Sequence, residues 1–258
     1  MSQLSQQVQN QISVSDKVVA SARTHADKVA EVLAAQAMEL GGPPPQATMG
    51  SYLAVFAAIA DRLAKKTEEL RKAEEDLAAE RSDDIPVRAT RDATAAALTT
   101  LLGLLRRTIE DHMGEKALAT YGLSTDSPRV PAKLLQYVKT VARQLGDHPT
   151  IVTSPLGSTF NSAVALQSLI TQSNQLEAAV GDDHREAREL ETALAARDRA
   201  AAAWSDAYQG TAATLEGLYR LAGYRDLAEK VRPTQRKIRG DDEGAELEGS
   251  AGEGMAGG

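Results

Sequence analysis

The sequence predicts an all-α protein, an elongated antiparallel bundle of about five long helices with additional short ones. Three observations predict this fold. Helix-forming Ala, Leu, Glu and Arg dominate the composition, whereas aromatic residues make up only 3% and runs of β-branched residues are scarce. Glycine and proline clusters divide the chain into long segments. Within these segments apolar residues recur in alternating steps of four and three, which places one stripe along a helix. The pattern is clearest at Leu190, Leu194, Ala201, Trp204, Tyr208, Leu215, Leu218 and Ala222.

The first half of the chain predicts two long helices separated by a strong break. We expect the first helix at residues 2–40, because the glycines and prolines of residues 41–45 suit a helix end and cannot continue a helix. We expect the second helix at residues 48–81, followed by a break at residues 82–86 where acids precede a proline. Its apolar seam is formed by residues seven apart, namely Phe56, Leu63, Leu70 and Leu77.

The remaining segments predict a third helix, a short fourth helix, two further long helices and one last short helix. Gly181 is followed by two acids, so it marks either a tight turn or a kink, and we expect the turn. The loop at residues 150–157 contains three aliphatic side chains and is expected to pack on the core. The expected helices are residues 86–120, 131–145, 158–180, 183–222 and 224–231.

Residues 1–232 are expected to form the bundle, with 1–145 and 158–232 as sub-units of it. Residues 233–258 are charged and rich in glycine, so they predict a disordered tail. An internal similarity links residues 91–110 and 197–216: each contains Arg-Asp, three alanines and Thr-x-Glu at a constant offset of 106 residues. It raises the alternative of two pseudo-repeated helical hairpins.

Charge and composition exclude several functional classes. The 258 residues carry a net charge of −7, which opposes binding to nucleic acid and to anionic lipid. Cysteine is absent, which removes disulfides and thiolate chemistry. Neither a signal peptide nor an apolar run of 18 residues is present, so we expect a cytoplasmic protein that does not cross a membrane.

No motif predicts catalysis, a cofactor or a metal. The Glu-x-x-His spacing of di-metal bundles is absent, and Glu110 and His112 point roughly 160° apart on a helix. The acids of residues 182–186 are typical of a helix start. Neither a Gly-x-Ser-x-Gly elbow nor a phosphate-binding loop occurs. We therefore expect no enzyme activity, and we expect His112 to be partly buried with one ring nitrogen bonded to a neighbour.

The candidate functional residues are those that a partner protein would contact. Leu63, Leu70 and Leu77 lie on a heavily charged helix and are expected to offer a thin apolar seam. Aromatic and arginine side chains are enriched at interfaces, which adds Tyr219, Arg220, Tyr224 and Arg225. The predicted function is a non-enzymatic structural or interaction protein, a scaffold or adaptor that uses exposed helix faces and its tail. Its partner is another protein or a second copy of the chain.

The alternative is an amphipathic, lipid-associated or pore-related bundle. Its basis is the pair of apolar runs at residues 52–60 and 95–105, which could lie against a membrane. The negative charge and the lack of a basic amphipathic face oppose this alternative.

Two C-terminal segments and one loop carry a resemblance. Residues 215–223 and 227–234 are similar to the end of certain bacterial all-helical proteins of unknown function, and Thr120-Tyr121-Gly122-Leu123-Ser124 resembles the loop after a long helix in such proteins. The resemblance implies an all-helical fold. It implies no activity, cofactor or site residue.

Overall fold

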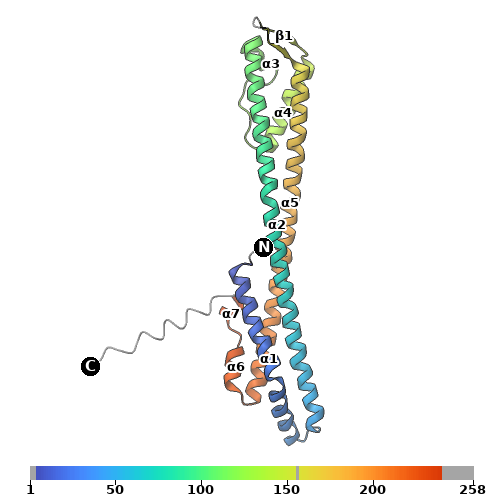
Figure 1. Ribbon diagram of the computed structural model, residues 1–258, viewed down its shortest axis with the longest axis vertical. Coiled ribbons are helices and arrows are strands. Elements are labelled where there is room, and N and C mark those ends of the chain that lie inside the picture. The colour runs from blue at the N-terminus through green and yellow to red at the C-terminus, as the bar shows by residue number, and fades with distance from the viewer. Residues whose placement is uncertain (1–3, 155–156, 240–258) are drawn as a thin grey trace, which may run out of the picture. The chain divides into compact units, whose positions relative to one another are not determined.

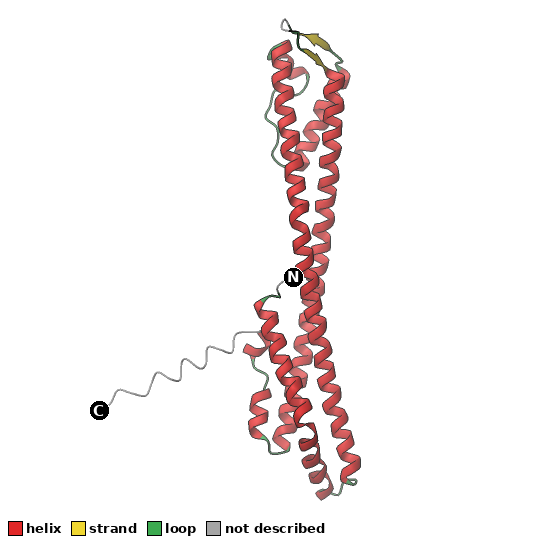
Figure 2. Cartoon of the chain, viewed as in Figure 1, coloured by secondary structure: helices red, strands yellow, loops and turns green. Residues whose placement is uncertain are grey.

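The computed structural model describes residues 4–154 and 157–239. Three helices are long: α1 (Gln6–Glu39), α2 (Pro45–Met113) and α5 (Ser162–Leu221). The shorter helices are α3 (Lys116–Thr120), α4 (Pro131–Asp147), α6 (Arg225–Val231) and α7 (Gln235–Arg239). Strands β1 (Ile151–Thr153) and β2 (Thr159–Asn161) pair antiparallel, with Val152 opposite Phe160. Figures 1 and 2 show this predominance of helix, which confirms the all-α prediction.

The chain divides into two compact units. Unit 1 takes the residues up to Ala79 and those from Thr192 onward, and unit 2 is Glu80–Glu191. Each unit therefore receives one segment of α2 and one of α5. This division differs from the sub-units 1–145 and 158–232 expected from the sequence, because neither long helix ends where the sequence predicted a break.

Unit 1 packs α1 against its segments of α2 and α5, as Figure 1 shows, and α6 closes the same core. Large aromatic rings fill the centre: Trp204 and Tyr208 are stacked at 5.3 Å, and Phe56 stacks with Tyr219 at 6.2 Å. The buried indole Nε1 of Trp204 donates to the Ser15 hydroxyl at 2.8 Å, which satisfies the one polar atom of that ring.

Unit 2 has a largely aliphatic core. Its segments of α2 and α5 pack with α4, and Phe160 and Tyr121 are the buried aromatic residues of this cluster. The apolar face of α4 points inward, as expected from the sequence for residues 131–145. The buried residues of that helix are Leu134, Leu135, Val138, Val141 and Leu145.

The predicted break at residues 82–86 is wrong, because α2 continues through Pro86. Proline removes one backbone donor and costs about 3 kcal/mol in a helix interior. Side-chain bonds span the adjoining turns without replacing that donor: Arg88 donates to Asp84 at 3.0 Å, and the Thr90 hydroxyl donates to the Pro86 carbonyl oxygen at 2.8 Å. Packing on both sides of the proline then keeps the helix intact.

The predicted turn at Gly181 is also wrong, because α5 continues through it. A glycine in a helix interior lowers stability by about 1 kcal/mol relative to alanine. The packing of the nearby buried side chains Leu176 and Ala179 contributes more than this. Asp183, expected at a helix start, instead bonds Arg91 on α2 at 2.9 Å. The described part of the chain therefore has three long helices where the sequence predicted about five.

Three smaller differences concern the helix ends. The helix expected to reach residue 120 ends at Met113, because Gly114 takes a left-handed conformation (φ +79°) and its N–H caps Glu110 at 2.8 Å. In the segment 150–157, residues 151–153 form β1 of the antiparallel pair, and Ile151 is 70% exposed instead of packing on the core; Leu156 lies outside the described residues. Of the expected disordered tail, residues 235–239 form α7; residues 240–258 lie outside the described residues.

α7 is held by contacts that a composition argument misses. The side-chain amide of Gln11 on α1 donates to the Ile238 carbonyl oxygen at 3.0 Å. The Ile238 side chain packs against the core of unit 1. The packing of Ile238 and this hydrogen bond tie the short helix to α1 and offset part of its ordering entropy.

In each unit, one arginine forms an ion pair between α2 and α5. We call this arginine with its acidic partners an arginine clamp. In unit 2, Arg91 on α2 bonds its neighbour Asp92 and reaches Asp183 on α5 at 2.9 Å. In unit 1, Arg197 on α5 bonds Asp198 and reaches Glu74 on α2 at 3.0 Å. Arg91 and Arg197 are related by the offset of 106 residues, so this geometry supports the predicted internal similarity.

Candidate functional site

Unit 1 buries the leucines that were expected to form a solvent-facing seam. Leu63 and Leu70 are fully buried and Leu77 is 1% exposed. The first two belong to the core that α1 and α5 complete. The expectation of an apolar seam open to a partner is therefore wrong for these three residues, because helices from distant parts of the chain already cover them.

The C-terminal aromatic and arginine residues are also partly engaged. Tyr219 is buried; its ring stacks on Phe56 and its hydroxyl lies 3.0 Å from that of Ser21. Burial raises the pKa of Tyr219, and the hydrogen bond to Ser21 opposes that rise. Arg220 forms ion pairs with Glu216 and Glu229. Tyr224 is half-buried and Arg225 is exposed.

An apolar groove in unit 2 is the stronger candidate for a partner site. It has a volume of about 310 Å³ and lies between α2 and the start of α5. Leu104 and Val164 stand on its two walls and are 54% and 63% exposed. The eleven described residues that line it carry no charge. Two exposed apolar side chains that line one groove are typical of a binding surface, whereas single exposed ones are ordinary.

Buried side chains position the groove. Leu105 on α2 and Leu169 on α5 anchor the two walls in the core of unit 2. Phe160 of β2 also lines the groove and packs against the ring of His112 at 6.3 Å. The β-hairpin thus contributes a buried aromatic ring to the lining, whereas Leu104 and Val164 are exposed.

His112 fastens the hairpin to α2. Its Nδ1 lies 2.8 Å from the Thr108 carbonyl oxygen, which can only accept a hydrogen bond. Its Nε2 lies 3.1 Å from the Ser158 hydroxyl and 3.3 Å from the Ser158 carbonyl oxygen. The histidine is half-buried with one nitrogen bonded to a neighbour, which confirms the expectation for this residue.

The Ser158–His112 pair has the contact that a nucleophile and its base require. Ser158 is nevertheless exposed, and the nearby amides of Ser154 and Gly157 already donate to carbonyl oxygens at 2.7 and 2.9 Å. These two amides are therefore not free to stabilise an oxyanion. We interpret the pair as a structural bond that holds the hairpin.

Three carboxylates of unit 2 form a cluster on α2 and α5. Oxygens of Glu80, Glu186 and Glu189 all lie within 4.8 Å of one another. Burial, Glu189, Glu80 and Asp83 raise the pKa of Glu186, against the effect of Arg185. The sequence search for metal ligands missed this cluster, because its members come from two helices. Acidic groups of this kind are common on helical surfaces, and we assign no ion to it.

The sequence contains part of the pattern from which this groove could have been predicted. Ile151, Val152 and Thr153 precede Pro155 and Gly157, and Thr159 and Phe160 follow, which is typical of a β-hairpin. Recognising it would have placed Phe160 beside α2. The exposure of Leu104 could not be found this way, since it lies in an apolar run that reads as core.

Comparisons with known proteins assign neither a family nor a function to this site. No family model, no curated protein and no solved structure matches the chain. Among residues 4–154 and 157–239, no helix has the length and apolar content needed to cross a membrane.

Proposed function

We propose that the protein is a non-enzymatic interaction protein of the cytoplasm, a helical scaffold or adaptor. In this proposal the groove of unit 2 receives the apolar face of a helix from a partner protein. The observation that carries the proposal is the pair of exposed apolar residues, Leu104 and Val164, on opposite walls of an uncharged groove. Helix-in-groove recognition uses such surfaces, with apolar anchors at positions i, i+3 or i+4, and i+7 of the bound helix.

The energetics support a specific but modest interaction. Complete burial of an exposed leucine or valine contributes about 1.5–3 kcal/mol, so Leu104 and Val164 can act as a small hot spot. The walls are fixed by Leu105 and Leu169, so little side-chain order has to be gained on binding. The lack of charge in the groove places the selectivity of the interaction in its apolar shape.

Affinity purification with matched variants tests this function. Leu104→Glu places a charge in the groove, whereas Val55→Glu places one on an exposed apolar position of α2 outside the groove. We expect a partner that is retained by the wild type and by Val55→Glu and lost with Leu104→Glu. Equal retention by all three forms would contradict the proposal.

A lipid-associated function is the second candidate, and one observation favours it. Ile151 on the β-hairpin is 70% exposed, in the same unit as Leu104 and Val164. The lining of the groove contains no lysine or arginine among the described residues, so it offers no attraction to anionic head groups. Flotation with neutral and anionic vesicles separates the candidates: we expect the protein to remain with the unbound fraction in both cases.

A further inference from the structure

Charge is absent from both chain segments that form the groove of unit 2. Residues 93–105 of α2, and residues 158–176 with β2 and the start of α5, contain no Asp, Glu, Lys or Arg, although these make up 25% of the chain. At the offset of 106 residues, the segment 199–211 of unit 1 contains Arg199 and Asp206. Exposed helix faces normally carry charged side chains, whereas depletion of charge marks the centre of an interface.

The outer faces of the two helices carry the same spacing of uncharged side chains. On each helix these side chains recur in steps of four, three and four, which places them on one face. Ala97, Thr171 and Gln175 are exposed, and the other members of the two stripes line the groove. The stripes are Ala97, Leu101, Leu104 and Thr108 on α2, and Val164, Ser168, Thr171 and Gln175 on α5. The walls of the groove thus have the spacing that the groove would accept from a bound helix.

The lack of charge favours a second copy as the occupant. A chain of net charge −7 repels its own copy, so two copies pack most easily where carboxylates are absent. A basic partner would be matched by acidic groups, and the described lining of the groove contains none. Charges return just outside the uncharged segments, with Arg107 and Glu177, as in the rim of an interface.

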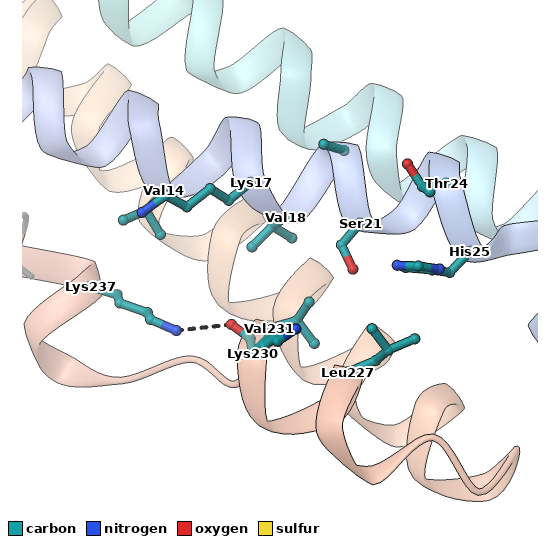
Figure 3. A pocket seen from close by; sticks show the side chains of 11 residues that line it. Val14, Lys17, Val18, Ser21, Thr24, His25, Leu227, Lys230, Val231 and Lys237 are labelled. Carbon is teal, nitrogen blue, oxygen red and sulfur yellow. Dashed lines mark hydrogen bonds between the residues drawn. The ribbon is translucent and has the colours of Figure 1, made fainter.

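Unit 1 has a larger hollow with a different chemistry. A cavity of about 500 Å³ lies between α1 and the helices α6 and α7, as Figure 3 shows. Lys230 of α6 and Lys237 of α7 border it, and Nζ of Lys237 donates to the Lys230 carbonyl oxygen at 3.1 Å. Two copies that met at this cavity would bring lysines toward lysines, which is unfavourable. Of these two hollows, the groove of unit 2 is the one whose described lining is uncharged.

We propose that a second copy of the chain occupies the groove of unit 2, in a two-fold symmetric dimer. Leu104 of each copy enters the groove of the other, so the two Leu104 side chains lie close together. A two-fold interface uses the same patch on both copies, and a groove whose walls carry the spacing that it accepts is self-complementary. This inference rests on the proposed function, because it names the partner at the same groove.

The size of the patch predicts a reversible dimer. Residues 93–105 span about 20 Å of helix, and two adjacent helices are together about 20 Å wide. This outline of about 400 Å², enlarged by the relief of the side chains, lies at the lower end of specific interfaces, which bury about 800 Å² per partner. We therefore expect a Kd on the order of 10 μM.

Sedimentation velocity of the purified full chain, from about 1 to 300 μM, tests the dimer. We expect the average mass to rise from that of one chain toward twice that value. Leu104→Glu and Val164→Glu, on the two walls, should each weaken association more than about tenfold, because each buries a charge at the interface. Val55→Glu is the matched control and should leave the dimer unchanged. Val55 is exposed in the uncharged residues 45–60 of α2 and does not line the groove.

Thiol crosslinking locates the contact. The chain has no cysteine, so Leu104→Cys supplies a single thiol. With a short bismaleimide we expect Leu104→Cys to give a covalent dimer and Val55→Cys to remain monomeric. Leu104 is 54% exposed, so its replacement leaves the core intact, and circular dichroism checks that the helices remain in every variant. If a glutamate variant lost its helices, the crosslinking result would decide alone.

A chain that stays monomeric over the whole concentration range would overturn the second copy as the occupant. The proposed function would still stand if affinity purification retained another protein that Leu104→Glu loses. A dimer that survives both glutamate variants, or that gives no crosslink at position 104, would also overturn the inference, because association would then use another surface. Equal weakening by Val55→Glu would reduce the effect to one of net charge and would overturn it as well.

Discussion

The two units use the same arginine clamp but differ in what surrounds it. Arg91 in unit 2 and Arg197 in unit 1 lie 106 residues apart, and both side chains are 26% exposed. Their acidic partners differ: the side chain of Glu74 is 5% exposed and also accepts a hydrogen bond from the Ser5 amide, whereas that of Asp183 is 19% exposed. The acidic partner of the clamp in unit 1 is thus buried, whereas that of the clamp in unit 2 lies nearer to solvent.

Residues that lie 106 positions apart also correspond in the cores of the two units. Comparing them shows where apolar surface remains exposed. Leu98 and Leu102 of unit 2 correspond to Trp204 and Tyr208 of unit 1, and all four are buried. Leu104, on the groove, corresponds to Gly210, an exposed glycine in unit 1. Unit 1 fills its interior with aromatic rings and has no side chain at the outer position. Unit 2 has an exposed leucine there, which supports a binding role for this position.

The largest effect is expected from Trp204→Ala. Removing a fully buried tryptophan costs about 3–5 kcal/mol and takes away the donor to the Ser15 hydroxyl, which keeps its bond to the Gln11 carbonyl oxygen. Hydrogen exchange followed by mass spectrometry should show lost protection in peptides of unit 1 before those of unit 2. Leu98→Ala at the corresponding position should reverse that order. The same order in both variants would break the comparison.

Next in size is the difference between the two clamps. Glu74→Ala should destabilise unit 1 by about 2 kcal/mol, because it removes both the cross-helix ion pair with Arg197 and the acceptor of the Ser5 amide. Asp183→Ala should cost about 1 kcal/mol, because its ion pair is closer to solvent. Denaturant unfolding monitored by exchange in each unit measures both. Equal losses would show that burial of the acid does not distinguish the clamps.

Pro86→Ala is expected to stabilise unit 2, by about 1–3 kcal/mol. Alanine supplies the missing N–H and removes the clash with the preceding turn in the middle of α2. The exposed position of Pro86 means that no packing is lost. If α2 ended near this residue, as the sequence predicted, the substitution would be neutral or destabilising. A rise in the unfolding midpoint therefore distinguishes one continuous helix from two.

One glutamate in each unit should respond to acid in the opposite direction from the other. Burial acts to raise the pKa of Glu74, but hydrogen bonds from Ser5 and Arg197, with the charge of Arg197, lower it overall. A lowered folded pKa gives stability that is present above the unfolded value of about 4.3 and lost as pH falls through the folded pKa. The raised pKa of Glu186 does the reverse: stability is highest below the unfolded value and falls as pH rises through the folded pKa.

Two glutamine variants isolate these contributions. In the wild type, the contribution of Glu74 should make hydrogen-exchange protection of unit 1 rise from about pH 3 to pH 6, an interval that spans the unfolded pKa of glutamate. Glu74→Gln should make this rise smaller. Ionisation of Glu186 should lower the exchange protection of unit 2 over the same interval, and Glu186→Gln should remove this contribution. Glu75→Gln is the control for the first, because Glu75 is an exposed neighbour on the same helix. A change in unit 1 of the same size in the control would contradict the role of Glu74.

Periodicity in the sequence predicted the all-α fold and the inward helix faces, because both are read from local spacing. Leu102, Val141 and Trp204 all lie on apolar stripes of the sequence, and all three are buried. The continuity of α2 and α5 was not predicted, since the local signals at Pro86 and Gly181 were overridden by packing and by the ion pair between the two helices.

The candidate site was less accessible to prediction for a related reason. Leu63 and Leu104 both lie in apolar rows of α2, and only the arrangement of distant segments buries the first and exposes the second. The cavity of unit 1 requires α7, whose short helix carries no strong local signal. Sites built by contacts between remote segments leave little trace in the spacing of residues.

A photo-crosslinking amino acid at position 104, compared with the same group at position 210, tests the central claim most directly. The two positions correspond by the offset of 106 residues, and both are exposed. In the native cell we expect position 104 to yield a protein adduct whose crosslinked peptide has apolar residues at helical spacing, and position 210 to yield none. Adducts at both positions, or at neither, would contradict a partner site in the groove of unit 2.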